Sequence, residues 1–180
     1  MGRLRDSSLF SDSDLVAYYE LDTGALTTDS KGSYTLSNQG SVGEASGKFG
    51  TSGDPGTPNS DNGVLYRTST FPALGSSNFT VAGWVNFNDV TAVSYFGNWC
   101  DSANDVFSRF AWGPNALGAG QPGYLFYRVK SGVAQQGPNF AGTPSTGVWI
   151  HVAMTYDGTN VRGYINGLLA AGPTAASGNG

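Results

Sequence analysis

The sequence predicts an all-β protein whose antiparallel strands form a two-sheet sandwich. Stretches of alternating apolar and polar residues recur along the 180 residues, and segments rich in Gly and Pro separate them. The chain contains 27 Gly and 8 Pro residues. No run keeps the 3.6-residue period of a helix over three turns. A chain of this length is typical of one domain and can bury a core between two sheets.

The clearest alternation lies near the C-terminus, where two strands at residues 149–156 and 161–165 flank the turn Asp157-Gly158-Thr159-Asn160. One face of this hairpin is apolar, with Ile150, Val152, Met154, Tyr156, Val161, Gly163 and Ile165. The other face carries His151, Arg162, Tyr164 and Asn166, which would make a poor core. Asn166-Gly167 then turns the chain into a short return strand at residues 168–171.

The remaining strands are expected at residues 15–22, 34–36, 64–67, 79–88, 91–99, 107–111 and 124–130. In the segment 79–88, Phe79, Val81 and Val85 fall on the core side and Trp84 on the other side. Residues 40–62, 113–123 and 131–147 are expected to form loops, the last with one further short strand. Residues 1–14 are polar and are predicted to form an N-terminal arm before a domain at residues 15–180.

Four motifs occur in the order that one known family uses. They are Leu15-Val-Ala-Tyr-Tyr-Glu-Leu-Asp22 with Asp29-Ser-Lys-Gly32, Gly47-Lys-Phe-Gly50, Asn78-Phe-Thr-Val-Ala-Gly-Trp-Val85 and Trp149-Ile-His-Val-Ala-Met-Thr-Tyr-Asp-Gly158. Over roughly residues 15–171 the chain resembles the laminin-G-like, concanavalin A-like lectin/glucanase family. The resemblance implies an antiparallel two-sheet jelly roll. It implies no ligand, because this fold carries lectins, adhesion modules, hydrolases and virion proteins.

The resemblance also implies that the domain lacks its final strand. Members of the family usually continue after the Asn-Gly turn with a loop and a last strand that pairs beside the first. Residues 172–180 have no apolar alternation from which to build it. We therefore expect the natural protein to continue past Gly180, or the arm of this chain or of a neighbour to supply the strand.

Charge and cysteine content restrict the partners. The net charge is −4 and the nine basic residues are scattered, so no nucleic acid partner is expected. Cys100 stands alone, which excludes an intrachain disulfide. No apolar run approaches the ~20 residues of a membrane span, and none forms a signal peptide at the start. The composition is typical of exported β-proteins, which favours a virion surface or an extracellular location.

The sequence does not predict an enzyme. Glycosidases need two carboxylates that flank the glycosidic bond, and hydrolases of this fold usually carry them as glutamates on one strand. Here Glu20 and Glu44 lie in separate segments, and His151 has no nucleophile in an elbow motif. We interpret the chain as non-enzymatic and keep a glycoside hydrolase as a last alternative.

Two groups of residues are candidate ligand-binding sites. The first is the polar face of the hairpin, with Arg162, Tyr164, His151 and Asn166, because rings stack on sugars while Arg and Asn bind hydroxyls. On this parity Trp84 and Trp149 are expected to cover the sheet beneath loops. The second group is a rim of loop aromatics, Trp99 and Trp112, close to Asn98, Asp101 and Asn104.

A calcium site is a further candidate. Asp22, Asp29 and Ser30 place hard oxygen donors after the first expected strand, and the resemblance implies a structural calcium ion near this loop. The alternative is that these side chains cap turns.

Two classes of function follow. One is an adhesion module on a virion or an extracellular assembly, whose partners are a glycan or protein surface and other assembly subunits. The other is a structural or decoration protein of a virion with no small-ligand site. The aromatic and polar face favours the first, whereas the polar arm and the missing signal sequence favour the second.

Overall fold

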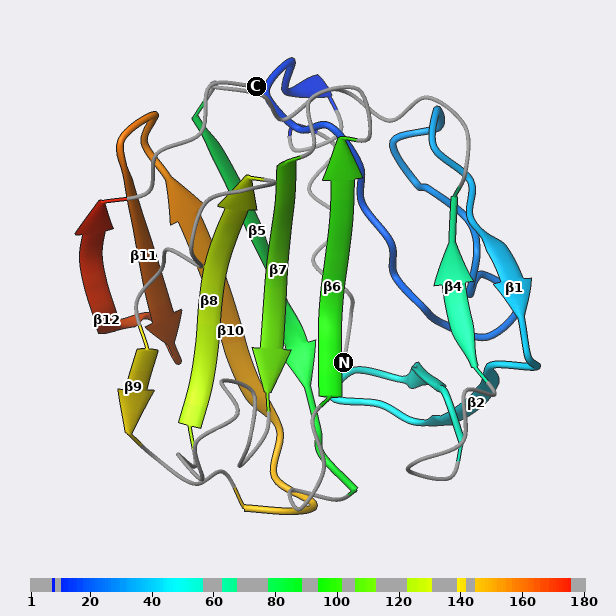
Figure 1. Cartoon of the computed structure of the whole chain (residues 1–180). Coiled ribbons are helices and arrows are strands. Elements are labelled where there is room, and N and C mark those ends of the chain that lie inside the picture. The colour runs from blue at the N-terminus through cyan, green and yellow to red at the C-terminus, as the bar shows by residue number, and fades with distance from the viewer. Residues whose placement is uncertain are drawn as a thin grey trace. The chain divides into compact units, whose positions relative to one another are not determined.

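The computed structural model describes residue 8 and residues 11–56, 63–67, 78–88, 94–101, 106–112, 123–130, 139–141 and 145–175, with side chains described outside residues 94–141. The fold is all-β, as predicted (Figure 1). The chain divides into two compact units, unit 1 (Met1–Pro72) and unit 2 (Ala73–Gly180). Among the described residues, no helix is long and apolar enough to cross a membrane.

Unit 1 contains two small antiparallel ladders. Strand β1 (Ser37–Gln39) pairs with β4 (Val64–Tyr66), and β2 (Gly43–Ser46) pairs with β3 (Thr51–Asp54). The prediction of a loop at residues 40–62, interrupted at Lys48-Phe49, is therefore wrong for residues 43–46 and 51–54, and β1 lies three residues later than the strand expected at 34–36. The alternation rule missed β2 and β3 because both consist mainly of small and polar residues.

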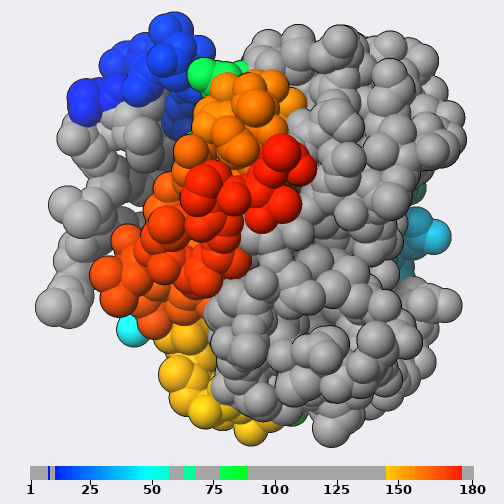
Figure 2. Space-filling view, turned by 60° about the vertical axis from the view of Figure 1, so that its left-hand side comes forward, coloured from blue at the N-terminus to red at the C-terminus, as the bar shows by residue number. Residues whose placement is uncertain are grey.

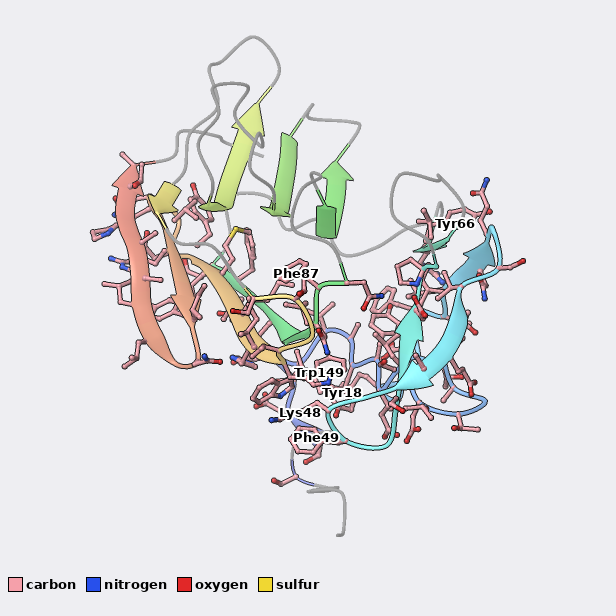
Figure 3. All side chains as sticks on the ribbon, turned by 90° about the horizontal axis from the view of Figure 1, so that it is seen from below. Tyr18, Lys48, Phe49, Tyr66, Phe87 and Trp149 are labelled. Carbon is pink, nitrogen blue, oxygen red and sulfur yellow. The ribbon has the colours of Figure 1, made fainter. Side chains whose placement is uncertain are left out.

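The turn between β2 and β3 explains how such strands pair. The Gly47 N–H donates to the Gly50 carbonyl at 2.9 Å, and Gly50 adopts φ +84°, a left-handed conformation that glycine tolerates best. Lys48 and Phe49, labelled in Figure 3, occupy the tip of this turn, where the Phe49 side chain is exposed.

The segment at residues 15–22 is not the regular strand that was predicted. Its one ladder contact within the described part of the chain is a single bridge between Tyr19 and Asp29. The Tyr18 N–H donates to the Asp29 carboxylate rather than to a strand, and Leu21 adopts φ +53°, which interrupts extended geometry. The expected absence of a final strand beside this segment stays a prediction, as does the division into an arm at 1–14 and a domain at 15–180.

In unit 2 a four-stranded antiparallel sheet has the order β12-β11-β10-β5. Its strands are β5 (Phe79–Val85), β10 (Ile150–Tyr156), β11 (Asn160–Ile165) and β12 (Leu168–Ala175). Figure 2 shows β11 and β12, in orange to red, along one face of the molecule. Strand β12 runs to Ala175, four residues beyond the predicted return. Asn166 and Gly167 both have positive φ (49° and 81°), as a two-residue type I′ hairpin turn requires.

A second antiparallel sheet has the order β6-β7-β8-β9. Its strands are β6 (Ser94–Asp101), β7 (Val106–Trp112), β8 (Gly123–Lys130) and β9 (Asn139–Ala141). This sheet lies in front of β5 and β10 in Figure 1, and β8 contacts β11 while β9 contacts β12. The two antiparallel layers confirm the predicted sandwich architecture.

The core of unit 2 lies on the apolar face of the four-stranded sheet. Met154, Tyr156 and Val161 are buried, and further apolar side chains pack against them: Phe79, Val81, Phe87, Ile150 and Ile165. The ring centroids of Phe79 and Tyr156 lie 5.7 Å apart, and the angle between the ring planes is 41°. The predicted assignment of alternate residues of β5, β10 and β11 to this face is confirmed, because Val85 and Val152 are also buried.

Truncation of Met154 tests this core. Met154 is 0% exposed, so Met154→Ala should lower the free energy of unfolding by about 2–5 kcal/mol through lost burial and a residual cavity. Thr80→Ala, a control at an exposed position of the same sheet, should change it by less than about 0.5 kcal/mol. Urea unfolding followed by fluorescence measures both, and equal effects of the two variants would contradict the assignment.

Candidate functional site

The face of the four-stranded sheet opposite the core presents three rows of side chains across its strands. Residues directly opposite each other share a face. One row holds Trp84 and His151; the next holds Ala82, Ala153, Tyr164 and Leu169; the third holds Thr80, Thr155 and Arg162. We call this set the outer face. Successive rows are two residues apart along each strand, about 6.7 Å.

Trp84 and His151 form the aromatic end of the outer face. The antiparallel register places them opposite each other, and their rings meet edge to face with centroids 5.4 Å apart and an interplanar angle of 67°. Trp84 is 40% exposed, so the expectation that loops cover this side chain is wrong. Trp149, which precedes β10, is half-buried.

Asn166, just after β11, is hydrogen-bonded to the backbone of β10. Its backbone N–H donates to the His151 carbonyl at 2.8 Å, and its side-chain Oδ1 accepts from the His151 N–H at 3.0 Å. The sequence predicted Asn166 as a ligand-binding residue. In the structure its Oδ1 fixes the backbone of His151, so Asn166 positions the site through His151.

Arg162, in the third row, forms an ion pair with Asp157 of the adjoining turn, with Arg162 Nη1 and Asp157 Oδ2 2.5 Å apart. Asp157 Oδ1 also accepts the backbone N–H groups of Thr159 (3.0 Å) and Asn160 (2.7 Å) in the hairpin turn. The hydrogen bond from Arg162, together with those two backbone donors, holds the pKa of Asp157 well below its ordinary value. The same hydrogen bond raises the pKa of Arg162.

Two alanines form the middle of the outer face. Ala82 and Ala153 carry its smallest side chains, and the larger side chains of Trp84, His151 and Tyr164 flank them. Tyr164 is half-buried, and Leu169, opposite Tyr164 on β12, is 54% exposed. A small flat molecule could therefore lie over the alanines while it contacts a ring and several polar groups.

The second predicted site, a rim of loop aromatics, is wrong in its placement. Trp99 and Trp112 lie within strands β6 and β7, not in loops. Trp99 is opposite Ser108 and Trp112 is opposite Ser94, so the two positions are four residues apart along the ladder, about 13 Å. Their side chains, and the whole of Asn104, lie outside the described residues.

In unit 1 the carboxylate of Asp29 is buried and organises the loop that follows residues 15–22. Four backbone N–H groups donate to it, from Tyr18 and Lys31 to Oδ1 (both 2.9 Å) and from Ser33 (3.1 Å) and Tyr34 (3.0 Å) to Oδ2. Burial by itself would raise the pKa of Asp29, but these donors outweigh it and the pKa lies below its ordinary value.

The carboxylate of Asp22 is also buried, and it ties the loop to β3. Its Oδ1 accepts from the Thr23 N–H (2.8 Å), the Thr51 N–H (3.2 Å) and the Thr51 hydroxyl (2.5 Å). A Cβ on Gly50 would approach both carboxylate oxygens to 3.3 Å, so the chain needs glycine there. Asp22 therefore serves as a hydrogen-bond acceptor between segments that are far apart in the sequence.

These contacts bear on the expected calcium ligands Asp22, Asp29 and Ser30. The four donors on Asp29 take the lone pairs that a cation would need, so Asp29 does not fit as a ligand in this geometry. Ser30 is exposed, and its N–H donates to the Tyr18 carbonyl. No group of three or more His, Cys, Asp or Glu side chains within the described ranges could hold a metal ion. Bound calcium stays a prediction.

Comparison with known proteins identifies the family to which this chain belongs. The chain belongs to the concanavalin A-like lectin/glucanases superfamily, whose sequence model matches residues 58–180. The family resemblance found from the motifs is thus confirmed, and the motifs at residues 15–50 lie before the matched region. No curated protein matches the sequence.

One similar solved structure is domain 4 of AbnA, a GH43 extracellular arabinanase from Geobacillus stearothermophilus, in complex with arabinotriose. It superposes with a TM-score of 0.63 at 20% sequence identity, over 92% of this chain and 80% of that chain. At this identity the likeness supports the jelly-roll fold.

The role of Asp29 is tested by Asp29→Asn. An amide nitrogen cannot accept, so two of the four part-buried N–H donors lose their partner, and stability at pH 7 should fall by about 2 kcal/mol. Because the folded-state pKa is lowered, the charged carboxylate stabilises the fold above the unfolded pKa of about 3.9, and this contribution is lost as pH falls through the folded value.

The measurement is urea unfolding from pH 7 to pH 2, with Asp14→Asn at an exposed position as the control. The gap between wild type and Asp29→Asn should narrow below about pH 4. A gap that is absent at pH 7, or that does not change on acidification, would contradict the assigned role.

Proposed function

We propose that this protein is a non-enzymatic glycan-binding module and that the outer face is its saccharide-binding surface. The observation that carries the proposal is the Trp84 ring, 40% exposed and fixed edge to face against His151, next to the two alanines. Membership of a superfamily described by its lectins and glucanases agrees with it.

The chemistry of the outer face suits a sugar. The C–H groups of a sugar ring stack on an aromatic face, a contact worth about 0.5–1.5 kcal/mol. Sugar hydroxyls need directional partners, which the Tyr164 hydroxyl, the His151 ring and the Arg162 guanidinium can supply. These side chains stand on two paired strands, β10 and β11, so little conformational entropy is lost when a ligand orders them.

The similar arabinanase domain adds support of a weaker kind. That domain is in complex with arabinotriose, so a jelly roll of this shape can hold a short neutral oligosaccharide. We carry over from it only the ligand class, a saccharide, and not the position of its site.

Several contacts argue against hydrolysis. Inverting and retaining glycosidases both need a pair of carboxylates at the bond. The described residues of the outer face and its adjoining turns offer one, Asp157, and its lowered pKa leaves it without a proton to donate at neutral pH. Glu44 lies on β2 in unit 1, where its Oε1 accepts the Gly24 N–H at 2.8 Å. Binding without turnover is therefore the function we favour.

The setting we propose is display on a virion or another extracellular assembly. A structural or decoration role without a small ligand is the second candidate, and one observation favours it. Leu168 and Leu169 are 75% and 54% exposed at the start of β12, which is an edge strand of its sheet, and an assembly subunit could cover them. A glycan-binding assay separates the two candidates.

Substitution of the two rings tests the glycan site. Trp84→Ala and Tyr164→Ala should each weaken binding of the best ligand on a neutral glycan array by roughly threefold to tenfold, because each removes one ring contact. Isothermal titration calorimetry measures the affinities. Leu168→Ala is the control, since Leu168 is exposed but pairs with Ile165 on the other face of the sheet.

An array without ligands would reject the glycan site and leave the structural role. Ligands whose affinities are unchanged by Trp84→Ala and Tyr164→Ala would move the site elsewhere on the protein.

The absence of catalysis is a separate prediction. The purified protein should release no reducing sugar from arabinan, β-glucan or any oligosaccharide that it binds, because the described residues of the outer face and its turns hold no carboxylate besides Asp157. Product formation by chromatography over a day is the measurement. Turnover that disappears in Glu20→Gln, Glu44→Gln or Asp157→Asn would show that the protein is an enzyme.

A further inference from the structure

We infer that Asp157 determines the specificity of the outer face and restricts it to uncharged glycans. The inference rests on the proposed function and adds the class of ligand. Asp157 does so by neutralising Arg162, whose guanidinium can still donate hydrogen bonds to hydroxyl groups.

The carboxylate of Asp157 is anchored from both sides. Its Oδ1 accepts the backbone N–H groups of Thr159 and Asn160, and its Oδ2 faces Arg162 Nη1. The turn itself is closed by the Asp157 N–H, which donates to the Asn160 carbonyl at 3.2 Å. Because the carboxylate is bonded to the turn backbone, it cannot swing away when a ligand approaches Arg162.

Arg162 keeps donors for a ligand. A guanidinium has five N–H groups, and the Arg162 guanidinium makes no other hydrogen bond to the described residues than the one to Asp157. Its side chain is 29% exposed and lies in the row next to Tyr164. A hydroxyl over Tyr164 can therefore accept from Arg162 through a charge-assisted hydrogen bond.

An anionic ligand would experience electrostatic repulsion at the same position. A carboxylate or sulfate placed at Arg162 would also lie close to Asp157 Oδ2, whose repulsion offsets most of the attraction. On the described outer face His151 is the other basic side chain, two rows away and about 13 Å along the strand. The net charge of −4 adds a weak repulsion at low salt. A neutral sugar experiences neither the repulsion from Asp157 nor the repulsion from the net charge.

The test is Asp157→Asn, which removes the negative charge while the amide oxygen can still accept from Thr159 and Asn160. Affinities are measured by calorimetry at about 20 and 200 mM salt. The probes are matched pairs, cellotetraose with cellotetraouronic acid and galactotetraose with tetragalacturonic acid, together with arabinotriose as a neutral probe without a charged counterpart. Asp157→Ser, whose hydroxyl can also cap the turn, replaces Asp157→Asn if that variant unfolds.

Wild type should bind the neutral member of a pair more tightly. In Asp157→Asn the ratio of uronate affinity to neutral affinity should rise roughly threefold to fivefold at low salt, the size of an exposed ion pair, and less at high salt. Adding Arg162→Gln should abolish that rise, because the gain depends on the released guanidinium. Asp14→Asn gives the same change in net charge and should leave the ratio unchanged.

The outcomes separate the inference from the proposed function. If neutral glycans bind and Trp84→Ala weakens them, but Asp157→Asn leaves the ratio unchanged, the glycan site stands and the role of Asp157 is rejected. A wild type that binds the uronate member as tightly as the neutral one also rejects that role. If wild type binds no saccharide, the proposed function and the inference fail together.

Discussion

The register of strand β10 against its two neighbours is the constraint on which unit 2 depends. Side chains alternate along a strand with a period of two, so the pairing of Met154 with Val81 and Gly163 places it in the core. A slip of one residue would bury His151 and Thr155 and expose Met154. The tight turn at each end of β11 prevents such a slip, because its hydrogen bonds fit one alignment of the strands.

The residues that fix this register also shape the outer face. Asp157 closes one turn and holds Arg162, while Asn166 closes the other end and holds the backbone of His151. Fold and candidate site are therefore not independent in this hairpin. A ligand would meet side chains whose backbone is already fixed, which lowers the entropy lost on binding and makes the identity of each turn residue matter for recognition.

The sequence predicted the parts of the fold in which alternation and turn chemistry agree, and it failed where other forces act. Strands β5, β10 and β11 and their buried face followed from alternating Val, Met and Tyr. The pair β2 and β3 escaped because small polar residues carry no alternation, and 15–22 did not become a strand because Asp29 takes its backbone donor. Arg162 and Tyr164 were correctly predicted to share one face of the hairpin. The Asp157 contact was missed because a turn aspartate has no sequence signal for a partner five residues away.

The two buried carboxylates of unit 1 explain why the family motifs indicate fold so well and ligand so poorly. Asp22 binds Thr51, 29 positions away in the sequence, and Asp29 accepts from four backbone donors, one in residues 15–22 and three in residues 31–34. Gly32 and Gly50, which belong to the same motifs, have φ angles of 108° and 84°, which residues other than glycine rarely adopt. Such positions are fixed by backbone hydrogen bonding, whatever the protein binds. The outer face lies under no such constraint except at its turns, so the ligand must be derived from side chains such as Trp84, Tyr164 and the Asp157–Arg162 pair.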